Sequence, residues 1–249
     1  MFANSDFYEK LQDNDWYYMP WKWEHEIAFN LIGENSKVLE VGSAKGNFLH
    51  SLAENKNCSC VGLEFNKKAI EESNSSKFQV FNSSIEEFSK TNNNSFDIVC
   101  SFQVLEHISD VKSFLAAKVQ CLKKGGNLII SVPNNNSFIS LDNNNILNFP
   151  PHHVGRWNKK SLQYLEKIFP LKTYKIFYEP IQEYHKKWYN ETLNNQVKSI
   201  TKNHFILSRI YWKLPSFLKK VFHQLLLSVL KMTYKNGHSI IIIFKKIDD

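Results

Sequence analysis

Residues 40–47 join a predicted strand to a predicted helix through small side chains. They read Glu40-Val41-Gly42-Ser43-Ala44-Lys45-Gly46-Asn47. Such a turn lets a ligand approach the backbone closely, and free N–H groups at a helix start can bind a carboxylate or a phosphate. Ala44 replaces the second glycine of the dinucleotide pattern, and the Gly-Lys-Ser/Thr end of a P-loop is missing. The turn therefore predicts a ligand site that departs from both patterns.

Glu64 ends the next predicted strand, 22 positions beyond Gly42. A carboxylate at the tip of a second strand can accept hydrogen bonds from both hydroxyls of a ribose. Such a charge-assisted contact is worth roughly 1.5–3 kcal/mol, and it disfavours a 2′-phosphorylated ribose by repulsion. The alternative is an ordinary surface glutamate that begins the next loop.

Three histidines follow predicted strands at the edge where ligands enter an open α/β sheet. His107 follows the fourth strand, and His152 and His153 lie in a long loop after the fifth. A hydroxyl nucleophile needs a general base, for which we favour His153 or His152 over His107. The alternative is that all three are structural or only position a substrate. No tight cluster of Asp, Glu and His ligands stands out, so we expect no metal site.

The elements that position these residues alternate between apolar strands and helix-like segments. We predict helices at 46–53, 67–73, 84–89 and 111–122, and strands at 37–41, 60–65, 78–81, 96–102 and 126–132. Parallel strands need intervening helices, and continuously apolar strands are buried on both faces. The alternation therefore predicts an α/β fold with a parallel sheet covered on both sides.

After residue 132 the regular alternation of predicted strands and helices stops. A long loop (133–158) precedes a predicted helix at 159–168 and a strand at 173–179, and a buried strand at 239–244 ends the pattern. Between them, residues 182–237 resemble no strand. Their centre, 216–232, is predicted to be an amphipathic helix, with one apolar face formed by Phe217, Leu218, Val221, Phe222, Leu225, Leu226, Val229 and Leu230.

Composition excludes several classes of protein. The chain has 249 residues, of which 43% are hydrophobic and 22% charged, so it is not disordered or fibrous. No apolar run approaches the roughly 18–20 residues that span a bilayer. The first residues lack the basic and apolar segments of a secretory signal. With four cysteines in addition, of which Cys58 and Cys60 are expected to be buried strand material, this favours reduced thiols and a cytoplasmic protein.

The basic charge lies in the last quarter of the chain. Residues 181–249 hold 12 basic and 4 acidic side chains, whereas residues 1–180 hold 19 and 20. A nucleic-acid enzyme would more often carry its basic residues around the active-site cleft. The distribution therefore indicates a surface for phosphate groups or anionic lipid, or a solvated lysine-rich face.

Five motifs together resemble the class I S-adenosylmethionine-dependent methyltransferases, over about residues 36–180 and the last strand. They are VLEVGSAKG (38–46), VGLEFN (61–66), FDIVCSFQVLEHISD (96–110), LKKGGNLIISVPN (122–134) and PPHHVGRW (150–157). The chain is most similar to a subgroup with quinone-biosynthesis O-methyltransferases and small methyltransferases of bacterial glycan pathways, in which the end of strand four reads close to VLEH.

The resemblance implies a Rossmann-like three-layer sandwich. Its seven-stranded sheet would be mostly parallel, with the last strand antiparallel and inserted next to the strand at 173–179. We expect a single domain, 1–249, with a cofactor-binding core at 36–181 and 238–246. An N-terminal aromatic cap (1–35) contains Trp16, Tyr17, Tyr18, Trp21 and Trp23 and would close over the cofactor or be pinned to the sheet edge. A basic helical insert (182–237) precedes the last strand.

The resemblance also implies the cofactor site. The loop at 42–46 would hold the methionine part of S-adenosylmethionine and Glu64 the ribose. Phe102 and Gln103 would lie beside methionine and adenine. Ser84 stands where the family often has an acidic residue that contacts the adenine amine, so a backbone contact is expected there. The full expected set is Glu40, Gly42, Ser43, Ala44, Gly46, Glu64, Phe65, Ser84, Ile85, Phe102 and Gln103.

The expected activity is O-methylation of a small-molecule or sugar hydroxyl in a cell-surface glycan pathway. The alternatives are a quinone or other lipid-soluble phenol as acceptor, or a non-catalytic cofactor-binding partner protein. No nucleic acid is expected, because Asn148-Phe149-Pro150-Pro151 has the wrong order for an amino-methylating motif and no Pro-Cys nucleophile is present. The basic insert is expected over the substrate entrance, where it favours an anionic or lipid-linked acceptor, with peripheral contact to the inner membrane face through residues 208–234.

Overall fold

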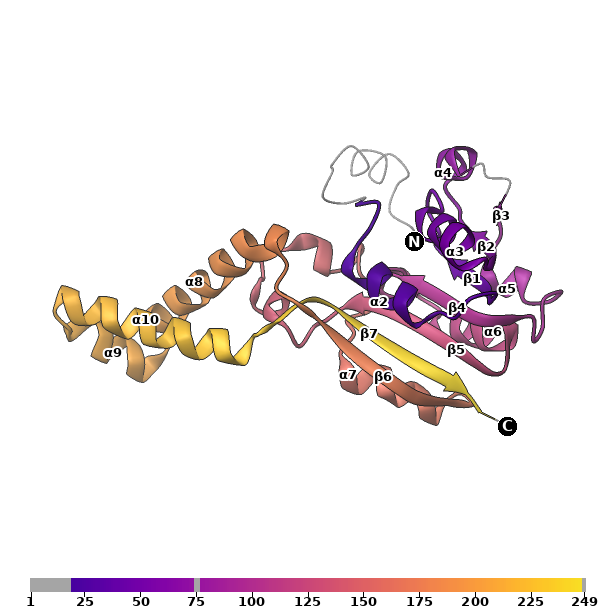
Figure 1. Cartoon of the computed structure of the whole chain (residues 1–249). Helices are drawn as coiled ribbons and strands as arrows, with labels where there is room; N and C mark the ends of the chain where they lie inside the picture. Colours follow the sequence, from indigo (N-terminus) through magenta and orange to yellow (C-terminus); the bar gives the residue numbers. More distant parts are fainter. Residues whose placement is uncertain (1–18, 74–76, 248–249) are drawn as a thin grey trace.

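A seven-stranded sheet forms the centre of the computed structural model, which describes residues 19–73 and 77–247 (Figure 1). The strand order is β3-β2-β1-β4-β5-β7-β6, and only β7 runs antiparallel to its neighbours among the paired strands described. The strands are β1 (Lys37–Val41), β2 (Ser59–Leu63), β3 (Phe78–Phe81), β4 (Phe96–Phe102), β5 (Leu122–Pro133), β6 (Leu171–Pro180) and β7 (Asn236–Lys246). The predicted fold class is confirmed, including the insertion of the last strand beside β6.

Helices cover both faces of this sheet, because successive strand side chains point to opposite faces. Leu39 and Val41 of β1 join one buried cluster, whereas Val38 joins the other. The first cluster is covered by α5 (Ile85–Phe88), α6 (Val111–Cys121) and α7 (Lys159–Gln163), and the second by α2 (Trp23–Leu31) and α3 (Asn47–Lys56). The short α4 (Lys67–Glu72) links β2 to β3.

Several predicted boundaries shift. Strand β2 ends at Leu63, so Glu64 lies just beyond the strand rather than within it. The predicted helix at 159–168 divides into α7 and a 3-10 turn, η4 (Tyr164–Lys167). The loop after β5 contains two 3-10 turns, η2 (Phe138–Leu141) and η3 (Ile146–Asn148), and η1 (Leu105–His107) follows β4. All four cysteines are free thiols, as expected, and all four are buried, whereas burial was expected for Cys58 and Cys60.

The insert forms an arm that projects from one end of the sheet (Figure 1). After the 3-10 turn η5 (Glu183–His185) it consists of α8 (Lys186–Asn203), α9 (Phe205–Lys213) and α10 (Ser216–Thr233). Tyr189 and Leu193 of α8 pack on Phe138 and Ile139 of η2. This small cluster, with half-buried α10 residues beside it, anchors the base of the arm to the loop after β5.

The apolar face predicted for α10 is divided in two. Its half-buried members turn inward. Its exposed members, Phe217, Val221, Leu225 and Val229, form an outward stripe together with the exposed Met232, which was not predicted. No helix within the described residues has the length and apolarity that a bilayer crossing requires.

Candidate functional site

A left-handed backbone turn follows β1. Gly42 has φ +79°, Gly46 has φ +75° where it caps α3, and Ala44 between them has φ +46°. A Cβ on Gly42 would lie 2.5 Å from Cγ2 of Val104, and one on Gly46 would lie 2.5 Å from a ring carbon of Phe78. Both the conformation and the close packing therefore require glycine at these two positions.

Glu64 joins the tip of β2 to this turn. Its Oε2 accepts a hydrogen bond from the Ala44 N–H at 2.9 Å, and its Oε1 accepts from the N–H groups of Phe65 and Asn66 at 2.8 and 2.9 Å. The carboxylate is thus aimed at the glycine turn, as its position in the sequence predicts. The exposed Phe65 ring (64% exposed) stands next to it.

Two buried polar atoms beside the turn have no hydrogen-bond partner among the residues that the structure describes. They are Oε2 of Glu40 and Oγ of Ser43. Burial, together with the nearby Glu64, raises the pKa of Glu40 well above its usual range. Polar atoms that are buried without partners are costly, so a polar ligand at this turn would relieve the cost.

The other expected cofactor residues are placed as follows. Phe102, at the end of β4, packs edge-on against Phe48. Gln103 has φ +55°, and its Nε2 lies 3.2 Å from each of three oxygens, on Glu24, Ser131 and Ser239. That side chain ties α2 to the sheet.

The residues expected to follow the third strand lie at the start of α5. The Ser84 hydroxyl accepts a hydrogen bond from the Glu87 N–H at 3.1 Å, so it serves as the helix cap. Ile85 is buried in the core.

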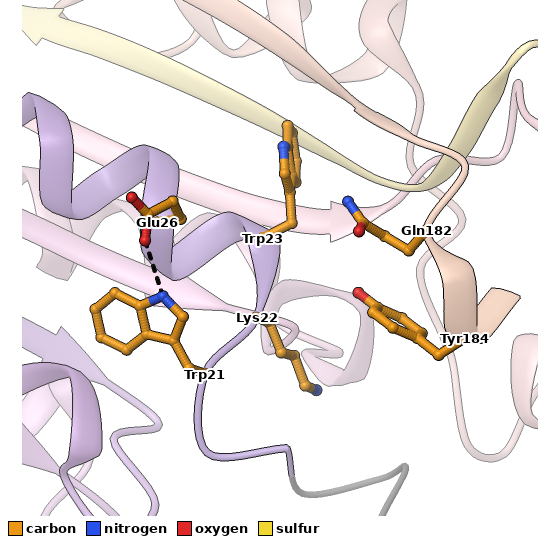
Figure 2. A pocket seen from close by; sticks show the side chains of 6 residues that line it. All are labelled: Trp21, Lys22, Trp23, Glu26, Gln182 and Tyr184. Atoms are coloured by element: carbon orange, nitrogen blue, oxygen red, sulfur yellow. Dashed lines mark hydrogen bonds between the residues drawn. The ribbon is translucent and has the colours of Figure 1, made fainter.

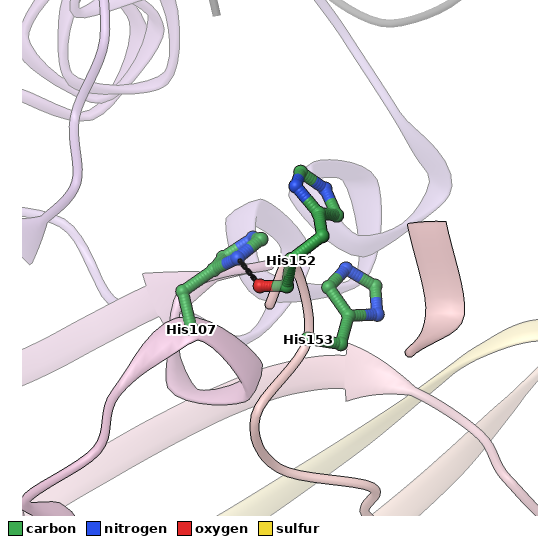
Figure 3. A group of neighbouring side chains, drawn as sticks. All are labelled: His107, His152 and His153. Atoms are coloured by element: carbon green, nitrogen blue, oxygen red, sulfur yellow. Dashed lines mark hydrogen bonds between the residues drawn. The ribbon is translucent and has the colours of Figure 1, made fainter. Parts of the chain in front are cut away.

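The three predicted histidines lie together (Figure 3). The ring centroids of His107, His152 and His153 are 4.9 Å apart in every pair. One ring nitrogen from each lies within 4.8 Å of the others. The sequence did not reveal this group of three histidines, because a loop 45 residues further along returns to the end of β4. The expectation that the protein has no metal site stays a prediction.

Burial keeps these imidazoles neutral. It is the largest cause that lowers the pKa of His152 to about 4 and that of His153 to about 2, and neighbouring histidines lower both further. Burial also lowers the pKa of His107, against the hydrogen bond from its Nδ1 to the His152 carbonyl. A low pKa makes each ring a weak proton acceptor on its own.

Buried carboxyl groups that the sequence analysis missed lie nearby. Burial raises the pKa of Glu106 to about 8 and that of Glu179 to about 7, and Glu24 adds to both shifts. Burial likewise raises the pKa of Glu24. Glu106 belongs to the VLEH motif and could have been noticed there, whereas Glu24 and Glu179 look like ordinary surface residues in the sequence.

A pocket of about 320 Å³ opens between the start of α2 and the start of the insert (Figure 2). Its walls connect to the buried carboxyl groups, because the Tyr184 hydroxyl donates to Oε1 of Glu179 at 3.1 Å. Of the predicted aromatic cap, Trp21 and Trp23 line it, whereas Trp16, Tyr17 and Tyr18 lie outside the described residues. The lining residues are Trp21, Lys22, Trp23, Glu26, Gln182 and Tyr184.

Known proteins share this fold and part of this sequence. A structure of a SAM-dependent methyltransferase from Archaeoglobus fulgidus superposes with a TM-score of 0.63 at 21% identity, over 96% of this chain and 98% of that one. A phosphoethanolamine N-methyltransferase from Haemonchus contortus, in complex with S-adenosyl-L-methionine, gives 0.60 at 14% identity, over 100% of this chain and 61% of that one. At these identities the likeness shows the fold.

Sequence comparison shows the family. The family described as "Methyltransferase domain" matches residues 16–176. Ubiquinone biosynthesis O-methyltransferases from Dictyostelium discoideum and Vibrio parahaemolyticus are 31% and 29% identical over 40% and 45% of this chain. The matches cover 29% and 48% of those proteins, so the chain spans less than half the length of these curated relatives. The chain belongs to the S-adenosylmethionine-dependent methyltransferase family, an enzyme family, and S-adenosylmethionine is its cofactor.

The glycine turn fits this cofactor. The buried atoms of Glu40 and Ser43 that have no partner among the described residues offer sites for the polar groups of a ligand at this turn. Glu64 places a carboxylate beside the turn, a group that can accept hydrogen bonds from ribose hydroxyls.

Replacing Gly42 by alanine tests the turn. A Cβ would clash with Val104, and a left-handed alanine costs roughly 1–2 kcal/mol. We expect Gly42→Ala to weaken S-adenosylmethionine binding, measured by calorimetry, by at least about tenfold, which is about 1.4 kcal/mol. Gly125→Ala is the matched control, because Gly125 has φ +73° but its Cβ would meet nothing closer than 3.9 Å. Equal affinities in the two variants would contradict the assignment.

Proposed function

We propose that this protein transfers the methyl group of S-adenosylmethionine to the hydroxyl of a lipid-soluble phenol. One observation carries the proposal: two parts of the site are in direct contact. They are the glycine turn at 42–46, which we assign to the methyl donor, and the turn that carries His107, which we assign to the acceptor. Val104 packs on Gly42, and the Val104 carbonyl accepts a hydrogen bond from the His107 N–H at 3.0 Å. Donor and acceptor chemistry therefore meet at the carboxyl ends of β1 and β4.

The donor half of the proposed site consists of the glycine turn and Glu64. Glu64 exchanges its hydrogen bonds with backbone N–H groups for bonds to the ribose hydroxyls, and the Phe65 ring lies beside the nucleoside. The methyl group of a sulfonium is already activated when the cofactor is bound, so the chain supplies binding and orientation. The acceptor oxygen forms the new C–O bond with its lone pair, the C–S electron pair stays on sulfur, and the hydroxyl proton leaves to solvent.

Removing the Glu64 carboxylate tests the donor half. We expect Glu64→Ala to weaken S-adenosylmethionine binding at least about tenfold, since charge-assisted hydrogen bonds are worth roughly 1.5–3 kcal/mol. Isothermal calorimetry measures the affinity. Glu71→Ala, at an exposed glutamate of the neighbouring α4, is the matched control and should bind as the wild type does. Unchanged affinity of Glu64→Ala for S-adenosylmethionine would contradict the assignment of Glu64 to the ribose.

The pocket supports an aromatic acceptor. Trp21, Trp23 and Tyr184 give it three aromatic walls, which suit a flat apolar ring. A phenol ionises near pH 10, far more readily than a sugar hydroxyl, so it asks less of the weakly basic histidines nearby. The two curated relatives named above are ubiquinone biosynthesis O-methyltransferases, which agrees with this class. No observation favours a sugar of a glycan pathway, which stays a prediction.

An acceptor assay tests this choice. With methyl-labelled S-adenosylmethionine, we expect transfer to a catechol that carries an alkyl tail and none to nucleotide sugars. Tyr184→Ala should raise KM for the catechol at least about fivefold, because it removes one wall that would contact the ring. Tyr174→Ala, at an exposed tyrosine of β6 away from the pocket, should not change KM. Labelling of the sugars instead would refute the phenol proposal.

The insert supports delivery of such an acceptor from a bilayer surface. The first residues of the insert, Gln182 and Tyr184, line the pocket, and no residue of α9 or α10 does. These two helices project away from the sheet (Figure 1). The sequence has no acidic residue between Glu191 and Asp248. The exposed apolar stripe of α10 therefore lies on a pair of helices, α9 and α10, that carry basic and no acidic side chains, which suits an anionic membrane interface.

Cationic side chains also lie over exposed aromatic rings on the arm. The Lys219 ammonium lies 5.4 Å from the centre of the Trp212 ring, and the Arg209 guanidinium lies 4.3 Å from that of Phe205. Both rings are largely exposed. Aromatic side chains beside cations suit the level of lipid headgroups.

Vesicle sedimentation tests this docking surface. We expect Val221→Glu with Leu225→Glu, on the outward stripe, to lower binding to vesicles containing phosphatidylglycerol at least about tenfold. Gln224→Glu with Ser228→Glu changes the charge by the same amount on exposed positions of the same helix and should lower binding less. Equal losses in the two double variants would show that the apolar stripe does not insert. A change in sedimentation velocity without vesicle binding would show a second copy of the chain as the occupant and overturn the membrane proposal.

A further inference from the structure

The histidine cluster is fixed in place by the backbone around it. The Glu106 carbonyl accepts hydrogen bonds from the N–H groups of Val154 and Gly155 at 2.9 and 3.0 Å. The Nδ1–H of His107 donates to the His152 carbonyl at 2.8 Å. The turn after β4 and the loop after β5 are therefore joined on both sides of the three rings, so the cluster is assembled before any ligand binds.

The same hydrogen bonds orient the rings. His107 uses Nδ1 for the His152 carbonyl, which leaves Nε2 as its ligand atom. Nδ1 of His153 lies 3.4 Å from Oδ1 of Asn148, a longer contact of the same kind. Histidines that bind metal ions regularly donate their other ring N–H to a carbonyl or carboxylate oxygen, which fixes the tautomer and the ring orientation.

The spacing suits a metal ion after a small closure. Ligand atoms of the three rings lie within 4.8 Å of one another. Tetrahedral Zn²⁺ with bonds of about 2.0–2.1 Å places its nitrogens about 3.4 Å apart. Side-chain rotations that shorten the separations by up to about 1.4 Å therefore complete the site. Within the described residues, the cluster holds imidazoles and no carboxylate. Imidazole suits zinc, copper, iron and nickel, whereas magnesium, calcium and manganese prefer oxygen ligands.

We propose that His107, His152 and His153 bind a divalent transition-metal ion of the Zn²⁺ class, with one coordination position left open. Its role rests on the proposed function: the open position takes the acceptor oxygen, and the ion lowers the pKa of that hydroxyl as a Lewis acid. The proton then leaves to water, and the histidines act as ligands rather than as the base.

Metal titration of the tag-free full-length protein, stripped with a chelator, tests the site. We expect one equivalent of Zn²⁺ to bind, and Co²⁺ to give the visible absorption of a tetrahedral complex. His107→Ala and His153→Ala should each weaken Zn²⁺ binding about a hundredfold or more and abolish the Co²⁺ absorption. His50→Ala, at an exposed histidine of α3, is the matched control and should bind as the wild type does.

Calorimetry with S-adenosylmethionine on the same variants separates loss of the metal site from loss of the fold. Donor affinity should stay unchanged in His107→Ala and His153→Ala, which shows that these chains fold. Zn²⁺ binding of equal strength in the wild type and in both variants overturns the metal site, whatever the donor affinity. If the wild type did not bind S-adenosylmethionine, the proposed function would be overturned, whereas the result of the metal titration would still hold.

Discussion

The left-handed turn at Gly42 is the constraint on which the rest of the site depends. Because Gly42 and Gly46 lack a Cβ, Val104 and Phe78 can pack directly on the turn. The Ala44 N–H then reaches the Glu64 carboxylate, so loops from three neighbouring strands meet in one place. A side chain at Gly42 would push the end of β4 away and would carry the His107 turn with it. The proposed donor and acceptor groups thus depend on the same close packing at Gly42.

Local patterns in the sequence were sufficient to predict the strands and helices of the core. Buried β-strands read as apolar runs, and helices follow them, so the strands and the place of Glu64 could be predicted. The order of the sheet, with β7 between β5 and β6, came from the resemblance rather than from the residues. Boundaries shifted by a few residues, as in β2, because the hydrogen bonds that end a strand are set by its partners.

The proposed acceptor side was harder to predict because its contacts join distant segments. His107 and His152 are 45 residues apart, and nothing in either local sequence indicates that they touch. Glu24 and Glu179 are buried by tertiary packing alone. In α10 the periodicity correctly predicts a broad apolar face, but only the packing of α8 and of the loop after β5 decides which half of that face is covered.

The proposed acceptor side of the site contains buried carboxyl groups whose charge affects the proposed reaction. On the acceptor side, burial favours the neutral forms of Glu24 and Glu179, because it raises both of their pKa values. Because their neutral forms are favoured, these groups repel a phenolate formed there less than carboxylates with ordinary pKa values would at low dielectric. In the proposed reaction, an oxygen anion and a sulfonium cation cancel each other's charge as the methyl group passes between them. Weakly charged, buried surroundings favour that cancellation over the separated ions, so the burial of these carboxyl groups suits the chemistry proposed here.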